Sequence, residues 1–367
     1  MENAPEIRHI QTTKAFRALE NDWNNLLTQS NLRTAFLSWE WLFSWWQVYG
    51  GDKTLWIITA WQDNALTGIF PLAMSIDVKS GFKFHTLRSL GSPLIDIGGI
   101  IVKENDTNTI DSLIKYLIAH KDAWDILELN QFMQNNPTLD FLRKEFVAAG
   151  AIARAKTDKH FYVPLNTSWD NLLASLSKGF RKNLRRAQKR AEDSGKVQLE
   201  HFSQEAVRWD VFERILEVNR HAQYPLLYNS EHERALHKAF VEHHHGKNFL
   251  TIFLLSINGI PKAYEYGFLY DGRYESWRAG YDKRLDPKIS IGVLLLQKVI
   301  KYAIEIGYDE IDFLRGEETY KQRWQPLYRE YAKIRFIKKN NIPAYTIFVL
   351  FPKLKEWLKS LLPIRNI

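Results

Sequence analysis

The sequence predicts an α/β protein made of two tandem units, each a mixed, mostly antiparallel sheet flanked by helices. The chain has 367 residues, and a single core rarely grows beyond about 250–300 residues, so two cores are expected. Hydrophobic residues make up 45% of the chain and charged residues 25%, which is typical of ordered globular domains. The same order of predicted helices and strands occurs twice along the chain, although the two copies share no residue-level similarity.

The first half begins with two predicted helices, and the second of them carries four tryptophans, so we expect it to be largely buried. β-rich runs follow, and the turn pair Asp63-Asn64 joins the first two. The elements expected in this half are helices at 13–29, 36–48, 107–120 and 137–148, and strands at 54–62, 66–76, 82–102, 124–131 and 160–165.

The second half opens with a helix-prone stretch from Trp169 and a basic helix that Gly195 closes. The pair Asn258-Gly259 is a strong hairpin signal, and a third strand follows Asp271-Gly272. The remaining expected elements are helices at 204–222, 229–245, 291–307 and 317–327, and strands at 248–257, 260–270, 275–282, 308–316 and 332–337. We therefore expect a first domain over 1–166, a second over 167–340 and a separate tail over 341–367.

The composition indicates in which cellular compartment the protein works and which classes of partner it binds. The chain has no cysteine, which excludes disulfides, thiolate zinc sites and a cysteine nucleophile and fits a reducing compartment. No signal peptide or stretch of about 20 apolar residues occurs, so a cytoplasmic location is expected. The net charge of +8 and pI near 9.3 favour a nucleotide cofactor, tRNA or an anionic membrane as partner; DNA is not expected.

The tail combines aromatic and leucine residues with lysines, which is the composition of an interfacial helix at the inner face of a membrane. The favoured alternative is that the tail docks onto the protein's own surface. No metal site is expected, since the consecutive histidines at 243–245 cannot face one ion from a regular helix.

The start of the helix at 291–307 is a candidate anion site. Its first residues are Ser290, Ile291, Gly292 and Val293, and the free N–H groups and dipole of a helix start attract phosphate. The alternative is an ordinary serine-capped helix without a ligand.

The basic helix at 178–190 is a second candidate phosphate surface. Steps of three to four residues place five cations along one broad face, namely Lys178, Arg181, Lys182, Arg185 and Lys189. We assign Arg181, Lys182 and Arg185 to substrate binding, with a nucleotide-linked sugar, a lipid phosphate or tRNA as the partner. A merely solvated helix is the alternative.

Residues 180–195 and 277–324 resemble the GNAT superfamily, and more closely the CelD-like acetyltransferases of cellulose and exopolysaccharide synthesis, which are relatives of the FemAB aminoacyltransferases. The resemblance implies that 277–306 form the strand, pyrophosphate loop and helix that hold acetyl-CoA or another acyl-CoA. The implied cofactor-binding residues are Ala279, Gly280, Tyr281, Ile289, Ser290, Ile291, Gly292 and Val293.

Two features depart from this pattern. The superfamily's loop carries several basic and glycine residues, whereas DPKISIG keeps only Gly292 securely. Because the FemAB branch uses aminoacyl-tRNA, that donor stays open as a less favoured alternative. The corresponding loop of the first half, at 96–109, has acidic and β-branched residues, so we expect no cofactor site in that half.

The resemblance also suggests catalytic residues. It makes Tyr320 the general acid beside the thioester sulfur, with a buried core tyrosine as the alternative. Glu265 should point away from Tyr264 and Tyr266 on its strand and act as the base if burial raises its pKa; a solvent-facing strand residue is the alternative. Asp312 is a further candidate base.

The acceptor side is assigned by the same resemblance. Lys321 and Trp324 would line it, with core packing as the alternative for Trp324, and Glu318 is a further candidate for base or substrate binding. With no cysteine and no serine elbow, direct transfer of the acyl group to a small-molecule or nucleotide-linked acceptor is expected, preferably to an amine. The alternatives are a FemAB-like aminoacyl-tRNA-dependent transferase, for which the coiled-coil arm is absent, and a non-catalytic protein that binds anionic glycans or membranes.

Overall fold

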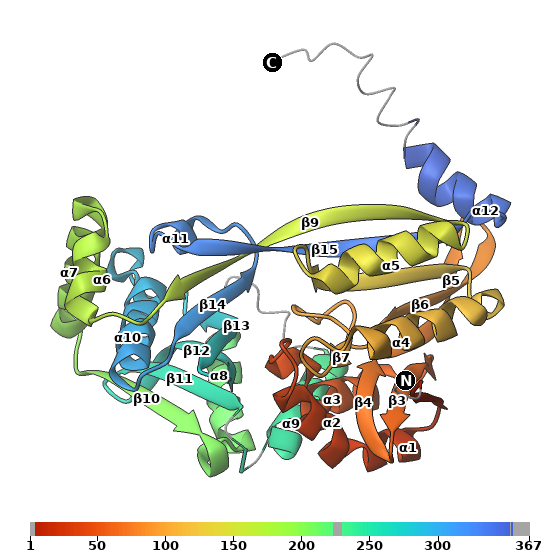
Figure 1. Ribbon diagram of the computed structural model, residues 1–367. Coiled ribbons are helices and arrows are strands. Elements are labelled where there is room, and N and C mark those ends of the chain that lie inside the picture. Colours follow the sequence, from red (N-terminus) through yellow and green to blue (C-terminus); the bar gives the residue numbers. More distant parts are fainter. Residues whose placement is uncertain (1–3, 223–229, 245, 248, 353, 355–367) are drawn as a thin grey trace. The chain divides into compact units, whose positions relative to one another are not determined.

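The computed structural model describes residues 4–222, 230–244, 246–247, 249–352 and 354. The chain forms two compact α/β units, and each unit is assembled from segments that are separated in the sequence (Figure 1). Unit 1 contains the described residues of Met1–Leu32, Gly50–Thr157 and Tyr331–Ile367, and unit 2 consists of Arg33–Tyr49 and Asp158–Glu330. The division differs from the expected boundaries after 166 and 340, because Arg33–Tyr49 belongs to unit 2 and the tail belongs to unit 1.

Unit 1 is built around two sheets. Its helices are α1 (Thr13–Ala18), α2 (Glu20–Thr28), α4 (Thr107–Ala119), η2 (Lys121–Ala123), α5 (Pro137–Ala148), α12 (Ile342–Tyr345) and the π-helix η6 (Thr346–Leu350). Its strands are β1 (Glu6–Ile10), β2 (Thr54–Leu55), β3 (Ile57–Gln62), β4 (Ala65–Phe70), β5 (Leu72–Lys79), β6 (Phe82–Ser89), β7 (Ile101–Val102) and β8 (Ile126–Met133). Strands β9 (Ala151–Pro164) and β15 (Leu327–Lys338) each contribute residues to both units.

The strand order in unit 1 is β1-β3-β4-β7 in the smaller sheet and β15-β8-β6-β5-β2 in the larger one. Helix α4 contacts β1, β3 and β4 of the smaller sheet and also α5, and both helices contribute to the main core, which includes residues of both sheets. One face of the larger sheet carries a small core in which the tail helix buries Ala344, Ile347 and Val349 against Phe84 and its neighbours. Docking of the tail onto the protein is therefore confirmed for its first turns, and most of its remainder lies outside the described residues.

Unit 2 has one sheet in the order β10-β11-β12-β13-β14-β9. Its strands are β10 (Val197–Ser203), β11 (Leu250–Ile257), β12 (Ile260–Tyr270), β13 (Arg273–Tyr281) and β14 (Glu310–Arg315), together with the second half of β9. Its helices are η1 (Ala35–Leu37), α3 (Trp39–Tyr49), α6 (Trp169–Ser175), α7 (Lys178–Asp193), η3 (Gln204–Ala206), α8 (Trp209–Asn219), α9 (Glu231–His244), η5 (Pro287–Ile289), α10 (Ile291–Glu305) and α11 (Thr319–Gln322).

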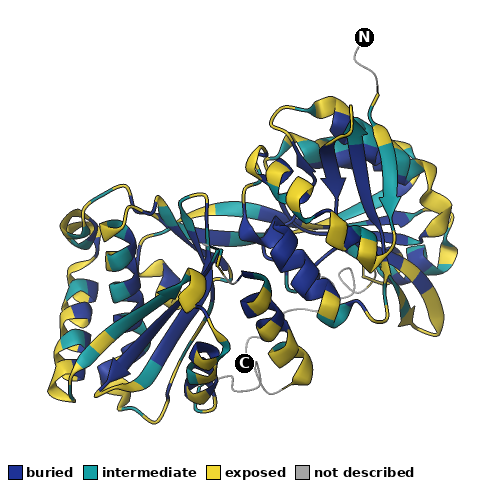
Figure 2. Ribbon diagram, turned by 90° about the horizontal axis from the view of Figure 1, so that it is seen from below, coloured by how far each residue is buried: buried dark blue, intermediate teal, exposed yellow. Residues whose placement is uncertain are grey.

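Strand β13 pairs with β14 in parallel, whereas β10 with β11, β11 with β12, β12 with β13 and β14 with β9 pair antiparallel. Helices α6, α7 and α10 build the core on one face, while α8 and α9 contact β11, β12 and β13. Exposed residues gather on the outer sides of the helices and in the loops, while the strands are mostly buried (Figure 2). Helix α3 has eight consecutive buried residues, as its tryptophans predict, and it packs against α9.

The predicted elements are largely present, with four differences. Strands β1 and β10 were not expected, and most of 90–100 is loop. The helix expected at 204–222 begins at Trp209. The helix expected at 317–327 is a single turn, because Gln325 has a φ of +53° and precedes a proline, which disfavours helical backbone. None of the described helices is long and apolar enough to cross a membrane.

Candidate active site

A β-bulge in β13 shapes the centre of the unit 2 sheet. Gly267 pairs with Ser276 and Tyr266 pairs with Arg278, so Trp277 is the extra residue. A Cβ on Gly267 would lie 2.0 Å from the Glu275 carbonyl oxygen. Only glycine therefore allows the two strands to approach this closely at the bulge.

Strands β13 and β14 pair only at their beginnings. The parallel ladder runs from Arg273 with Glu310 to Glu275 with Asp312 and then stops. Among the described residues, no other strand pairs with that side of β13 over residues 276–281, which we call the open edge. Its backbone groups can bond an extended ligand that carries amides.

Glu265 lies in the middle of β12 and is only 3% exposed. Ser276 donates a hydrogen bond to Glu265 Oε1 at 2.7 Å. Burial raises the pKa of Glu265 to about 7, although the hydrogen bond from Ser276 partly opposes the rise. Tyr264 and Tyr266 point to the other face, where their hydroxyls contact Asn219 and His237. The solvent-facing alternative for Glu265 is thus wrong, and its role as a base stays a prediction.

Tyr320 lies on α11, near enough to Glu265 for that carboxyl group to affect the pKa of the tyrosine. Burial and then the nearby carboxyls of Glu265 and Glu318 raise the pKa of Tyr320 above its ordinary value. The residue as a whole is 43% exposed, and its ring lies edge-on to Phe313, so it is not a core tyrosine. A tyrosine that keeps its proton at neutral pH can act as a hydrogen-bond donor.

Asp312 lies on the opposite face of the sheet. It pairs in register with Glu275, whose Oε1 accepts a hydrogen bond from Thr34 at 2.6 Å, and strand alternation separates this face from that of Ser276. Burial raises the pKa of Asp312 to about 6, and its carboxyl accepts the Leu314 N–H. The structure therefore does not bring Asp312 to Glu265, and Asp312 instead stabilises the end of β14.

Helix α10 begins without a side-chain cap. Ser290 has φ +54° and ψ +48°, and its side chain makes no capping hydrogen bond. The ordinary serine-capped start is therefore wrong, and the first N–H groups of the helix stay available to an anion. A Cβ on Gly292 would lie 3.1 Å from Tyr281 Cδ1, so this glycine makes room for the exposed Tyr281 ring.

The other expected cofactor residues surround this helix start or lie along β13. Ala279, Gly280 and Tyr281 belong to the open edge, and Gly280 leaves room for the Tyr264 ring. Ile289 and Ile291 are buried, so only their backbone groups could contact a ligand. Lys288 and Ser290 are exposed near the helix start, whereas Val293 is partly buried and packs against the core.

The residues expected on the acceptor side divide into two groups. Glu318 is exposed and pairs with Lys321 at 2.8 Å. Lys321 is 1% exposed, and its ammonium also donates to the carbonyls of Arg315 and Gly316, so it holds the turn after β14. Trp324 lies in the core against Phe180 (ring centroids 5.2 Å apart), so its ring cannot line an acceptor site in this conformation.

Helix α7 presents the basic surface that its sequence predicts. Its apolar face, with Phe180 and Leu184, packs into the core beside α10. Arg181 donates to the Ala174 carbonyl and Arg190 to the Lys288 carbonyl. In the part of the chain that the structure describes, no ion pair neutralises the exposed cations Lys178, Lys182, Arg185, Arg186 and Lys189.

Unit 1 also has two neighbouring parallel strands, β6 and β8, which correspond to β13 and β14, but in unit 1 a loop fills the opening between the strands. Strands β6 and β8 pair in parallel up to Arg88 with Glu128. The loop after β6 then returns, and Gly98 pairs with Phe132 and donates its N–H to the Gln131 carbonyl at 2.8 Å. This plug, residues 91–98, lies against β8 and so enters the opening of unit 1 that corresponds to the opening between β13 and β14 in unit 2.

Sequence reasoning missed Tyr274 and Ser276, although the strand alternation that places Glu265 could have found them. Counting from the Asp271-Gly272 turn gives the pairing correctly as far as Ser276 with Gly267, and the bulge at Trp277 shifts the register only beyond that pair. In the described residues, no group of three histidine, cysteine, aspartate or glutamate side chains could hold a metal ion.

The comparisons with known proteins agree with this architecture. Residues 178–322 match the family model described as an acetyltransferase (GNAT) domain, which runs from the start of α7 to the end of α11. No curated protein sequence matches the chain significantly.

Several solved structures have a similar fold. FemX is 12% identical, with 93% of this chain and 99% of FemX covered and a TM-score of 0.61. L-PGS from Bacillus licheniformis is 14% identical, with 90% and 95% covered and a TM-score of 0.55. A conserved protein of unknown function from Bacteroides thetaiotaomicron is 14% identical, with 91% and 100% covered and a TM-score of 0.53. The chain therefore consists of two tandem GNAT-like α/β units and carries a GNAT-like acetyltransferase domain at residues 178–322.

Proposed function

We propose that unit 2 transfers an acyl group from an acyl-CoA, preferably acetyl-CoA, directly to an amine or hydroxyl of a small acceptor. The observation that carries this proposal is Glu265, a buried carboxyl group with a pKa of about 7 on the strand next to the open edge of β13. A general base works best when its pKa lies near the working pH. Burying a carboxyl group is costly, and side chains with such shifted pKa values concentrate at functional sites.

The donor lies along two features of unit 2. Its pyrophosphate binds the start of α10, where no side chain caps the first backbone N–H groups and Gly292 carries no side chain. Its pantetheine arm runs along the open edge, where the backbone of Ala279–Tyr281 bonds the amides. This placement brings the thioester toward the level of Glu265, which pairs with Ala279.

The chemistry then follows from the side chains. The acceptor nitrogen attacks the thioester carbonyl carbon while its proton passes to Glu265, directly or through a water molecule. A backbone N–H of the open edge stabilises the oxyanion. When the carbon–sulfur bond breaks, the sulfur receives the proton of Tyr320, so that the free thiol leaves. No covalent acyl-enzyme forms, since the chain has no cysteine.

The acceptor class follows from the charges near this site. Glu318 is exposed beside Tyr320 and suits the recognition of an amine or hydroxyl group. The cations of α7 suit an acceptor that carries phosphate, such as a nucleotide-linked sugar or another cell-envelope precursor. The CelD-like resemblance favours an exopolysaccharide precursor within this class.

A second candidate function is aminoacyl transfer from aminoacyl-tRNA. The exposed, unneutralised cations of α7 favour it, because such a row can follow a phosphate backbone. The resemblance to the FemAB aminoacyltransferases points the same way. In this case the aminoacyl ester would replace the thioester at Glu265, and the start of α10 would not require a pyrophosphate.

Calorimetric titration of acetyl-CoA tests the proposal, with Ser290→Asp and Ser290→Asn as a matched pair. Both side chains have the same shape and can cap a helix, so both variants should fold. Only aspartate adds a negative charge next to the proposed pyrophosphate. We expect wild type and Ser290→Asn to bind and Ser290→Asp to lose at least about tenfold in affinity through charge repulsion.

The other outcomes are equally informative. Equal binding by both variants would place acetyl-CoA elsewhere. If wild type does not bind acetyl-CoA but binds aminoacyl-tRNA with an affinity that falls on Arg185→Glu, the second candidate replaces the first. Binding of neither donor would favour a non-catalytic protein that recognises anionic glycans or membranes.

A further inference from the structure

Unit 1 exposes large apolar side chains around the tip of one hairpin and along the tail helix. Strands β5 and β6 meet in the two-residue turn Ser80-Gly81, which is flanked by Val78, 68% exposed, and Phe82, 49% exposed. Beyond η6, residues 351, 352 and 354 are helical, and Phe351 is 57% exposed. The exposed apolar residues of this part of the tail are Leu350, Phe351 and Leu354.

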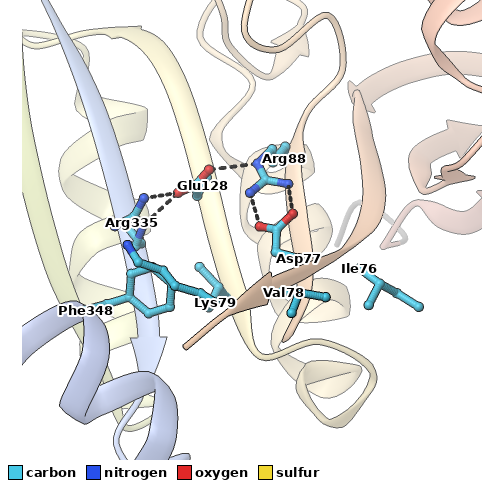
Figure 3. Close-up of a pocket in the computed structure, with 9 residues that line it drawn as sticks. Ile76, Asp77, Val78, Lys79, Arg88, Glu128, Arg335 and Phe348 are labelled. Atoms are coloured by element: carbon cyan, nitrogen blue, oxygen red, sulfur yellow. Dashed lines mark hydrogen bonds and ion pairs between the residues drawn. The ribbon is translucent and has the colours of Figure 1, made fainter. Parts of the chain in front are cut away.

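Phe348 joins the hairpin and the tail helix into one surface. Its ring lies edge-on to Phe84 of β6, with centroids 5.5 Å apart. Lys79 Nζ lies 4.7 Å and Arg335 Cζ 4.8 Å from the centre of the same ring. Figure 3 shows the Phe348 ring next to Arg335 and Lys79, with Arg335 between the ring and Glu128. We call the hairpin tip and the exposed side of the tail helix the docking surface.

A cavity of about 440 Å³ opens beside Phe348 on this face of the sheet. At its base, Glu128 accepts hydrogen bonds from both Arg88 and Arg335, and Arg88 also pairs with Asp77 (Figure 3). Burial opposes ionisation of Glu128, but the two arginines hold its pKa below the ordinary value. With Lys79, three cations and two carboxylates line the cavity, which leaves one net positive charge for an anionic group.

Positive charges predominate in the sequence around the docking surface. Residues 338–367 contain six lysine and arginine residues and a single acidic residue, Glu356. Lys79 and Lys83 add two exposed cations at the hairpin tip. Apolar side chains interleaved with lysines and almost without acids match an anionic lipid surface. A second copy of the same surface would place like charges against each other.

We propose that the docking surface binds an anionic phospholipid bilayer, with Phe82, Phe351 and Leu354 entering the interface and the cavity beside Phe348 receiving a lipid phosphate. The binding is peripheral, because the side chains enter only at the level of the headgroups and the first carbons. It uses unit 1 alone and does not depend on the chemistry proposed for unit 2.

Vesicle co-sedimentation of the full chain tests this. We expect the protein to sediment with vesicles of mixed phosphatidylglycerol and phosphatidylcholine. Its binding to vesicles of phosphatidylcholine alone should be weaker by a factor of at least about ten. Added salt should weaken the binding, since a Debye length is only about 8 Å at physiological ionic strength.

Matched variants separate the docking surface from general adhesion. Phe351→Glu combined with Leu354→Glu should lower the partition coefficient at least about tenfold, whereas Val147→Glu, at an exposed apolar position on α5, should leave it unchanged. Lys79→Glu should weaken binding to phosphatidylglycerol vesicles more than Lys144→Glu, an exposed lysine of α5.

Three results would overturn the proposal. The first is a wild-type protein that stays in the supernatant with phosphatidylglycerol vesicles. The second is equal loss of binding in the docking-surface variants and the α5 controls. The third is a dimer in analytical ultracentrifugation that Phe351→Glu dissociates while vesicle binding is unchanged, which would assign the surface to a second copy of the chain. Binding of inorganic phosphate without vesicle binding would reduce the cavity to an ion site.

Discussion

Glu265→Gln should make the protein more stable at pH 8 and catalytically impaired. An acid whose pKa is higher in the native state than in the unfolded state binds its proton more tightly when folded. The free energy of unfolding therefore falls as pH rises between the two pKa values and levels off above the higher one. Glutamine keeps the shape and the contact with Ser276 but has no proton to lose, so it removes this penalty.

The magnitude follows from the burial of this side chain. The pKa of Glu265 rises from 4.5 to about 7, and one pKa unit corresponds to about 1.36 kcal/mol. Ionising Glu265 therefore costs the native state about 3 kcal/mol above pH 7. The variant should exceed wild type by about this amount at pH 8 and by much less at pH 4, where both side chains are neutral.

Urea unfolding at several pH values measures the difference between the two proteins. Glu275 and Asp312 also have raised pKa values, but they titrate in both proteins and largely cancel. A difference that does not change with pH would mean that Glu265 keeps an ordinary pKa, and the argument for a poised base would fail. In parallel, kcat of the variant should drop by about 100-fold or more, and the rise of the wild-type rate through pH 7 should disappear.

Three further changes test other parts of the site. Gly267→Ala should lower the free energy of unfolding by about 1–3 kcal/mol, because the added Cβ would lie 2.0 Å from the Glu275 carbonyl oxygen. Thermal unfolding measures the loss, and the control is Gly51→Ala, whose Cβ would have nothing within 4 Å. Tyr320→Phe should reduce kcat about 100-fold at a nearly constant KM, and an unchanged kcat would remove Tyr320 from the chemistry. Lys321→Met should cost about 1–3 kcal/mol of stability through unbonded carbonyls, whereas a change confined to the KM of the acceptor would restore its binding role.

Local signals predicted much of the fold. Asn258-Gly259 and Asp63-Asn64 form the expected hairpins, with positive φ at all four residues, because only such residues adopt this backbone at low cost. Strand alternation also placed Glu265 opposite its tyrosine neighbours. These features depend on residues close in sequence, and one chain is enough to recognise them.

The features that were missed depend on contacts far apart in sequence. The placement of Arg33–Tyr49 in unit 2 rests on long-range contacts, including the hydrogen bond from Thr34 to Glu275. The bulge at Trp277 shifts the pairing by one residue, and periodicity does not reveal such a shift. The sequence favours the acceptor side for Lys321 and leaves core packing open for Trp324, because the burial of both depends on how the turn after β14 folds back.

The plug of unit 1 also bears on how such an opening is filled. Gly98 reaches the β8 edge as a short extended piece of polypeptide, and a Cβ there would lie 2.3 Å from the Asn130 carbonyl oxygen. A peptide backbone and a pantetheine arm both offer amide N–H and C=O groups along a thin chain. On the proposed function, the plug of unit 1 takes the place that the extended donor would take in unit 2, so transplanting residues 91–98 into the opening beside β14 should block acetyl-CoA binding.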